Sequence, residues 1–231
     1  MQEKIQELQA LCEAYFQAHP EAEKTKIQLL YIAEDEEGEL IEDEHNGLSY
    51  YAGEPPYIED WPYMEDTPMQ HMLTLDLRAL PQLNKQFISL FVAEPFENEA
   101  YEPYNPDTFL YYHSGQVRDE EQDAPIEPVD EQRPIAMFPI EVPTAAFLNE
   151  EEVEEAEDWD GEDFELSEEL NAIQLAIFNC SYIGGKPIWL QSKDYEGPFI
   201  GQFDMELVPE INLGDSGIMY IFEETAFWQC Y

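Results

Sequence analysis

Histidine and cysteine, whose side chains often carry catalysis, are few in this chain and do not group into a recognisable constellation. The four histidines, His19, His45, His71 and His113, stand in unrelated contexts, and their spacing is not that of a metal site. An enzyme needs a nucleophile or a tuned acid–base pair that a third group holds in place. No such set can be assembled here, so we interpret each histidine as an ordinary surface or core residue. The sequence predicts no catalytic residues and a protein that is not an enzyme.

Two other short patterns have simple interpretations. Asp204 and Glu206 are close in sequence, but in a chain with so many acidic residues such a pair arises by chance. The run Gly184-Gly185-Lys186 lacks the remaining residues of a phosphate-binding loop, so we interpret it as a turn. Neither pattern predicts a site.

The segment from Asp158 to Asp163 resembles a calcium loop, because alternating carboxylates before a glycine can surround a hard cation. With Gly161 at the sixth position of such a loop, Ala156 and Ser167 fall where carboxylate ligands are expected. Adventitious binding of a divalent cation and a solvated acidic loop are both compatible with this pattern. We expect no dedicated metal site and no cofactor.

The same region is the densest acidic tract of the chain, and it also contains large apolar side chains. Carboxylates around apolar anchors are typical of an interface in which charge sets the on-rate and a buried aromatic residue sets the affinity. We therefore predict a partner-binding surface, with Trp159 as its first test. Its residues are Glu150, Glu151, Glu152, Val153, Glu154, Glu155, Glu157, Asp158, Trp159, Asp160, Glu162, Asp163 and Phe164. The alternative is a solvated helix whose aromatic residues fold back on the core.

The net charge restricts the class of partner. Nine basic residues against 53 acidic ones leave a formal charge of -44. Such a field repels nucleic acid and anionic membranes, and it accelerates encounter with a strongly basic protein. We expect a basic protein as the partner, no nucleic acid and no membrane. The alternative is that the acidity only maintains solubility or reflects a salty or acidic habitat.

Cysteine content and hydropathy predict the compartment. Cys12, Cys180 and Cys230 are too few and too scattered for a disulfide framework or a zinc site. The N-terminal residues carry charges throughout and have no apolar signal core, and no run of about 18 apolar residues is present. We expect a cytoplasmic protein that is not exported, and a monomer.

Apolar periodicity predicts one N-terminal helix followed by many strands. Apolar residues at three- and four-residue spacing predict a helix over residues 2–18, which His19-Pro20 would end. Alternation in Met72–Leu77 predicts a half-buried strand. The stretch after Ser167 fits helix or strand, and Ser167 as a possible cap favours a helix. Other strands are predicted at residues 26–34, 40–41, 86–94, 109–113, 135–142, 199–207 and 217–223, with the last residues packed on the sheet.

The stretch Tyr50–Val92 has a diverged second copy near the C-terminus. A shift of 130 residues superposes Pro68 on Pro198 and the strand Ile88–Phe91 on Ile218–Ile221, and a shift of 132 matches Gly53 to Gly185. This repeat predicts a single α+β domain over residues 1–231, made of two pseudo-repeated, mainly antiparallel β-sheet halves with an N-terminal helix and few other helices. The first half covers about 25–148, an acidic connecting segment covers 149–169, and the second half covers about 170–231.

The chain resembles the YwqG-like family of bacterial proteins, usually described as a domain of unknown function. The segments that carry the resemblance are AGEPP, WP, TPMQHMLTLDLRALP and QFISLFVAE, followed by IGGKPIWLQ, GPFIGQFDMEL and GDSGIMYIF. The resemblance implies a single α+β domain of two similar sheet halves. It departs at Ala52, where such proteins usually have glycine, and at Met72, where glutamine is usual and Gln202 keeps it in the second half. Members of this family often occur beside bacterial toxins, and some look like immunity proteins.

Charge and resemblance together lead to one main hypothesis and two alternatives. The main hypothesis is a non-enzymatic immunity-type protein that binds and inhibits a basic toxin or effector. The first alternative is a module that binds a small ligand or a divalent cation in a cleft between the two halves. The second is a mimic of nucleic acid, whose carboxylates stand where phosphates would.

Overall fold

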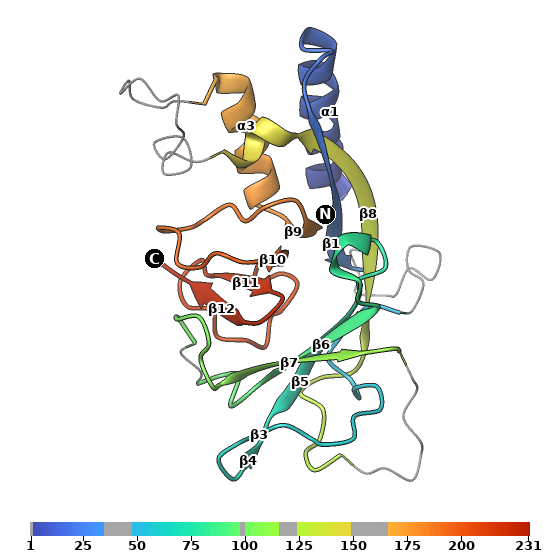
Figure 1. Cartoon of the computed structure of the whole chain (residues 1–231), viewed down its shortest axis with the longest axis vertical. Coiled ribbons are helices and arrows are strands. Elements are labelled where there is room, and N and C mark those ends of the chain that lie inside the picture. The colour runs from blue at the N-terminus through green and yellow to red at the C-terminus, as the bar shows by residue number, and fades with distance from the viewer. Residues whose placement is uncertain (1, 35–47, 98–99, 116–123, 149–165) are drawn as a thin grey trace.

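The computed structural model describes residues 2–34, 48–97, 100–115, 124–148 and 166–231, and it contains two α-helices, two short 3-10 helices and a set of mostly short strands (Figure 1). In chain order the elements are α1 (Gln2–Ala18), β1 (Lys24–Ile32), β2 (Tyr50–Tyr51), β3 (Tyr63–Met64), β4 (Thr67–Pro68), β5 (Gln70–Asp76), the 3-10 helix η2 (Pro81–Leu83), β6 (Phe87–Val92), β7 (Thr108–His113), β8 (Arg133–Pro143), the 3-10 helix η3 (Thr144–Phe147), α3 (Glu168–Phe178), β9 (Ser181–Gly184), β10 (Phe199–Phe203), β11 (Ile218–Phe222) and β12 (Ala226–Gln229). The class is α+β, with a mainly antiparallel sheet, an N-terminal helix and few other helices.

Most of the strands form one antiparallel sheet in the order β12-β11-β10-β9-β1-β8-β2-β5-β6-β7. At its centre β1 pairs with β8 along the whole length of β1, from Lys24 opposite Pro143 to Ile32 opposite Ile135. The strands β3 and β4 form a separate two-stranded hairpin.

The sheet curls until its two ends meet, so that polar groups at one end of the sheet form hydrogen bonds with polar groups at the other end. The Thr108 hydroxyl on β7 donates to the carbonyl oxygen of Ala226 on β12 at 2.8 Å. The Tyr112 hydroxyl donates to the carbonyl oxygen of Glu223 at 2.8 Å, and the Trp228 amide donates to the carbonyl oxygen of Ala100 at 3.0 Å. Exposed sheet edges invite pairing with other chains, and this closure covers them.

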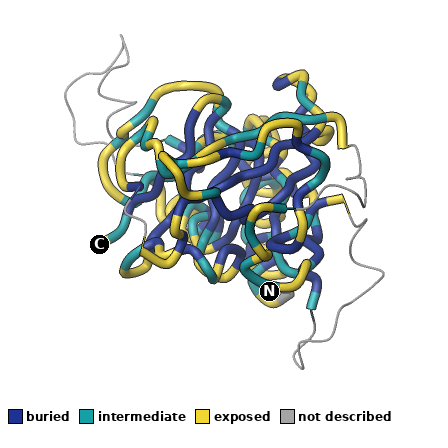
Figure 2. Tube along the Cα trace, turned by 90° about the horizontal axis from the view of Figure 1, so that it is seen from below, coloured by how far each residue is buried: buried dark blue, intermediate teal, exposed yellow. Residues whose placement is uncertain are grey.

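Of four apolar clusters in the described residues, the two largest lie on opposite faces of the sheet. The larger fills the inside of the curl and draws residues from both ends of the chain, among them Leu90 and Ile221. The second lies between the outer face of β1, β8 and β9 and the two helices, where Leu8 of α1 and Ile173 and Ile177 of α3 are buried. The dark blue interior in Figure 2 traces these buried segments, with exposed turns around them.

The local elements follow the sequence closely. The helix expected over residues 2–18 is confirmed, and so is the helix after Ser167, whose hydroxyl accepts a hydrogen bond from the Leu170 amide at 3.2 Å. The terminal segment forms β12 and packs in the sheet, as expected. The expectation of a half-buried strand at residues 72–77 was wrong, because every residue of β5 is buried. The strand predicted through Leu40 and Ile41 lies outside the described residues.

Candidate functional site

The acidic tract that the sequence singled out lies outside the described residues, and so does the calcium-like segment Asp158–Asp163 within it. This holds for all thirteen predicted partner-binding residues, from Glu150 to Phe164. The described residues on either side are Leu148, which follows η3, and Ser167, which caps α3. Both flanking residues lie next to α3, because the Gln174 side chain donates to the Leu148 carbonyl oxygen at 3.1 Å and Ser167 caps the helix.

A groove lies beside the two helices. It has a volume of about 650 Å³ and lies between α1, α3, the turn after β10 and the loop before β11. From α1 it is lined by Lys4, Glu7 and Leu11, whose spacing of three and four residues places them on one helix face. The other lining residues are Ala172, Leu175, Ala176, Phe178, Asn179, Asp204, Met205, Glu206, Ser216, Gly217 and Ile218. We call this feature the α1–α3 groove.

The walls of the α1–α3 groove are largely apolar, and two of its large apolar side chains are open to solvent. Leu175 is 58% exposed and Met205 is 47% exposed. Ala172 and Ala176 lie on the same face of α3 as Leu175, and their small side chains leave room between the helices. An exposed apolar surface framed by charged residues is typical of a site for another molecule.

The rim of the α1–α3 groove is acidic. The Lys4 ammonium is 2.9 Å from Oε2 of Glu206, so its charge is matched within the protein. Glu7 adds a further exposed carboxylate on α1.

Asp204 lies deeper in the groove and has a structural role. Its Oδ1 accepts hydrogen bonds from the Ser181 hydroxyl at 2.9 Å and from the Glu206 amide at 3.1 Å. Burial raises the pKa of this carboxyl above its usual range. These contacts hold the turn after β10, so we assign Asp204 to the fold and not to ligand binding.

A buried chain of polar side chains crosses β5, β6 and β7. The Gly53 carbonyl oxygen can only accept, so Nδ1 of His71 donates to it at 3.1 Å. In the neutral imidazole Nε2 is then an acceptor, and the Thr74 hydroxyl donates to it at 3.0 Å. Thr74 in turn accepts from the Ser89 hydroxyl at 2.7 Å. Every hydrogen bond up to this point has a fixed direction.

The chain of hydrogen bonds continues to His113 on β7. Nδ1 of His113 accepts from the Gly115 amide at 3.0 Å, so its Nε2 carries the proton and donates to Ser89 at 3.0 Å. Burial lowers the pKa of both His71 and His113 to about 4. Both imidazoles are therefore neutral at pH 7, and Ser89 is fully buried, which suits a structural network better than nucleophilic chemistry.

The remaining candidate groups are accounted for as follows. His19 is exposed and its Nε2 lies 3.3 Å from a carboxylate oxygen of Glu169, while His45 lies outside the described residues. In the described ranges, no three His, Cys, Asp or Glu side chains are grouped so that they could hold a metal ion.

The three cysteines carry free thiols. Burial raises the pKa of Cys12 to about 12 and that of Cys180 to about 11, so these thiols are poorly reactive at neutral pH.

None of the helices that the structure describes has the length and apolar character required to cross a membrane.

The residues of the α1–α3 groove were missed by the sequence reasoning. Leu11 falls within the helix predicted over residues 2–18, and Leu175 falls within the helix predicted after Ser167, but neither was predicted to line a site. Asp204 and Glu206 were interpreted as a chance pair of acidic residues. The available signal was that α3 carries more apolar positions than one buried face requires. No pattern in the sequence places α3 beside α1.

Comparison with known proteins adds no relative to this description: no protein-family model matches the chain, and no match is found among curated proteins.

Proposed function

We propose that this protein is a non-enzymatic, acidic, immunity-type protein that binds and inhibits a basic toxin or effector. The observation that carries the proposal is that the few basic side chains are matched internally. Seven of the nine lie within 4.0 Å of a carboxylate of the same chain, namely Lys4, Lys24, Lys26, Arg78, Lys85, Arg133 and Lys193. Arg118 lies outside the described residues, and Lys186 has an interaction of its own. A partner therefore meets an excess of carboxylates, which attracts and steers cationic proteins.

The cytoplasm is the proposed compartment, because free cysteines persist in reducing surroundings. We propose a monomer because two copies of a chain with a formal charge of -44 repel each other.

We also propose that the fold is a duplicated unit whose first strands have exchanged places. The supporting observation is the strand order, which reads alike from both ends: β12-β11-β10-β9 at one end matches β7-β6-β5-β2 at the other. Between them β1 and β8 pair antiparallel, as two strands related by a two-fold axis would. In this proposal the units are about 24–113 and 133–229, so β8 opens the second unit instead of closing the first half.

Repeated local geometry supports the duplication. The Asp76 amide donates to the Ser49 hydroxyl at 2.9 Å, and the Asp204 amide donates to the Ser181 hydroxyl at 2.9 Å. In both places Oδ1 of the aspartate accepts from the amide two residues further on, at 3.0 and 3.1 Å. The two aspartates are 128 residues apart and the two serines are 132 apart.

The turns that follow β2 and β9 also match. Ala52 and Gly53 have φ angles of 53° and 67°, and Gly184 and Gly185 have φ angles of 85° and 68°. Two successive left-handed residues are uncommon, so their recurrence at an offset of 132 supports a common origin of the turns. An experimental structure in which β2, β5 and β6 fail to overlay on β9, β10 and β11 would contradict the duplication.

The functional proposal is tested by mixing the purified protein with the basic product of a neighbouring gene. We expect a 1:1 complex by size-exclusion chromatography and calorimetry, inhibition of the partner's activity, and marked weakening when NaCl rises from about 0.05 to 0.5 M, because salt screens exposed charges. An unrelated protein of similar size and isoelectric point serves as the control for non-selective attraction. If no basic protein binds more tightly than this control even at low salt, the proposal is wrong.

A further inference from the structure

We propose that the α1–α3 groove is the docking site for the partner, and that it receives the apolar side chains of a segment flanked by lysine or arginine. This inference rests on the proposed function for the identity of the partner. It adds to the electrostatic attraction a specific binding site and a specific class of ligand. The argument uses the shape of the groove, its exposed apolar side chains and its charge.

The groove exposes apolar surface, and burial of that surface by another molecule is favourable. Leu175 and Met205 are two of nine large hydrophobic side chains that are exposed in the described residues, and both lie open in the same hollow, 58% and 47% exposed. They come from different elements, α3 and the turn after β10, and face one space. Apolar anchors that fill such a space carry most of the affinity of typical interfaces, whereas charges at a rim mainly set on-rate and selectivity.

The size of the groove suits a few side chains. A volume of about 650 Å³ lies within the range of roughly 300–1,000 Å³ that accommodates drug-sized molecules. Its two long walls are the helices α1 and α3, which stand beside each other at the top of Figure 1. One face of a partner helix or an extended segment could place two or three apolar side chains between them, with its backbone outside.

The charge of the groove selects among possible occupants. Glu7 and Glu206 are exposed at the rim. Because the Lys4 ammonium pairs with Glu206, the Glu7 carboxylate is the negative charge that the described part of the rim leaves unmatched. A basic segment gains from this arrangement. A second copy of the chain, nucleic acid and the chain's own acidic residues 149–165 all bring further negative charge to an acidic rim, which opposes their docking.

Three labelled synthetic helices test the site by fluorescence anisotropy. The first has a leucine face and lysines elsewhere, the second keeps the leucines and replaces each lysine by glutamate, and the third keeps the lysines and replaces each leucine by serine. We expect the first to bind at least about tenfold more tightly than the other two. Equal binding of the first and third helices would mean attraction by charge alone and would overturn the proposal, and so would failure of the first to bind.

The variant Leu175→Asp separates docking from attraction, because it removes an apolar anchor and adds a negative charge. If the groove binds the segment, this variant weakens binding of the first helix by about tenfold or more. If only charge matters, the added carboxylate leaves binding unchanged or strengthens it, and the proposal is wrong. Tyr63→Asp is the matched control, because Tyr63 is 52% exposed and lies in the β3–β4 hairpin, at the end of the molecule opposite the helices in Figure 1. Unchanged circular dichroism and thermal unfolding establish that both variants fold.

The rim is tested in the same way. Glu7→Gln should weaken binding of the lysine-bearing helix more than Glu65→Gln, which removes the same charge from the remote hairpin. If both variants weaken binding equally, the rim has no special role and the assignment of the groove to a basic segment fails.

Failure of this inference and failure of the proposed function give different results. If the natural basic partner binds the wild type and Leu175→Asp equally well, the function holds and the groove is not its docking site. If the synthetic basic helix binds the groove but no natural basic protein forms a selective complex, the groove binds such segments and the proposed function fails.

Discussion

His71 shows how a buried titratable side chain can be held neutral by its hydrogen bonds. Its two ring nitrogens are both used, one by the Gly53 carbonyl and one by the Thr74 hydroxyl, and it is only 2% exposed. Protonation would place a charge in a dry interior and would reverse the hydrogen bond from Thr74. The network therefore stabilises the fold only while the imidazole stays neutral.

Acidification should destabilise the protein through His71. Burial lowers its pKa to about 4 in the folded state, against about 6.5 in the unfolded chain, so the unfolded chain binds the proton first as the pH falls. The contribution of His71 to stability is intact above pH 6.5 and is lost between about pH 6.5 and 4, at up to about 1.4 kcal/mol per pH unit. Urea unfolding from pH 7 to 4.5 measures this slope.

His71→Gln is the control for this prediction, because glutamine can offer one donor and one acceptor but does not titrate. The many carboxylates titrate in both proteins, so the difference between the two slopes isolates the histidine. Parallel dependences of unfolding free energy on pH would show that His71 is not the source of the acid sensitivity.

Ala52 illustrates the cost of a side chain in an unusual backbone conformation. Its φ of 53° lies in the left-handed region, where glycine is normally preferred. The next residue, Gly53, also has a positive φ, and a Cβ on it would lie 2.5 Å from Cβ of Gln132. Glycine at Gly53 is therefore required for space as well as for conformation.

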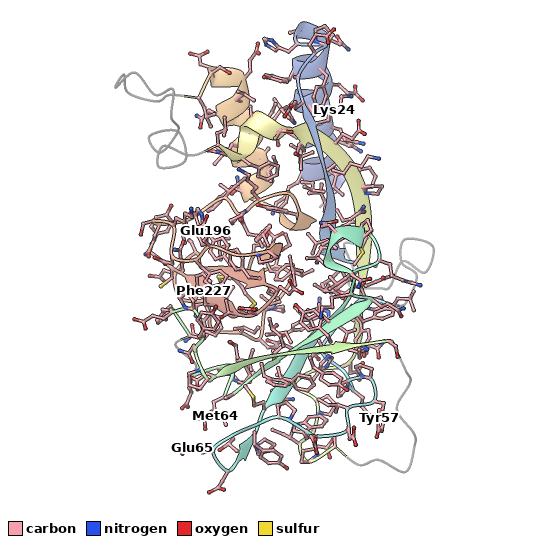
Figure 3. The ribbon with its side chains drawn as sticks, in the orientation of Figure 1. Lys24, Tyr57, Met64, Glu65, Glu196 and Phe227 are labelled. Carbon is pink, nitrogen blue, oxygen red and sulfur yellow. The ribbon has the colours of Figure 1, made fainter. Side chains whose placement is uncertain are left out.

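At the level of elements, the β3–β4 hairpin contains a turn that its residues do not favour. Tyr63 pairs with Pro68 and Met64 with Thr67, so the loop has two residues, Glu65 and Asp66. Glu65 has a φ of 55°, and Figure 3 shows it at the tip of the hairpin beside Met64. Two-residue hairpin loops prefer glycine where φ is positive.

Glu65→Gly should therefore stabilise the protein by about 0.5–1 kcal/mol, because it removes the steric cost of a left-handed residue. The substitution also removes a negative charge from a very acidic surface, which by itself reduces repulsion. Glu65→Gln is the matched variant that removes only the charge. Urea denaturation compares the three proteins, and equal stability of the glycine and glutamine variants would refute the conformational argument.

The helix α3 packs on the second core with one face and lines the α1–α3 groove with another. Ile173 and Ile177 are buried against the second core, while Leu175 points into the α1–α3 groove. The capping Ser167 and the acidic first turn, Glu168 and Glu169, are favourable at a helix N-terminus. The helix is thus locally stable enough to present an apolar residue to solvent.

For the whole molecule, the net charge of -44 makes self-repulsion a general destabilising force. The fold opposes it with two apolar cores and a sheet whose ends close on each other. Seven basic side chains lie close to carboxylates, but most of these pairs are exposed and contribute little each.

Moderate salt should therefore raise the thermal midpoint of unfolding. Between about 0.01 and 0.15 M NaCl the Debye length falls from about 30 to 8 Å, which screens the repulsion between carboxylates on different elements. Each kcal/mol that is relieved corresponds to about 2–4 °C for a chain of this size. Differential scanning calorimetry at pH 7 gives the measurement.

The same titration at pH 4.5 provides the control, because part of the carboxylates are then protonated and the salt effect should shrink. A midpoint that falls with salt at pH 7, or that rises equally at both pH values, would contradict the role of self-repulsion.

Local and additive properties could be predicted from the sequence alone. The helix over residues 2–18, the cap at Ser167 and the strands at β6, β8 and β11 follow from periodicity and residue type, because these depend on near neighbours in the chain. The net charge is a sum over residues and needs no coordinates.

Contacts between segments that are distant in the sequence could be identified only in the tertiary structure. Alternation in β5 marked one apolar face correctly, but it could not reveal that the polar face is also buried, since hydrogen bonds of His71 and Thr74 with distant residues make that possible. In the same way, no residue pattern indicates that α3 packs beside α1, and the α1–α3 groove exists only because of that contact. Which distant segments meet depends on the balance of burial over the entire chain, whereas a sequence pattern reports only what each segment could bury.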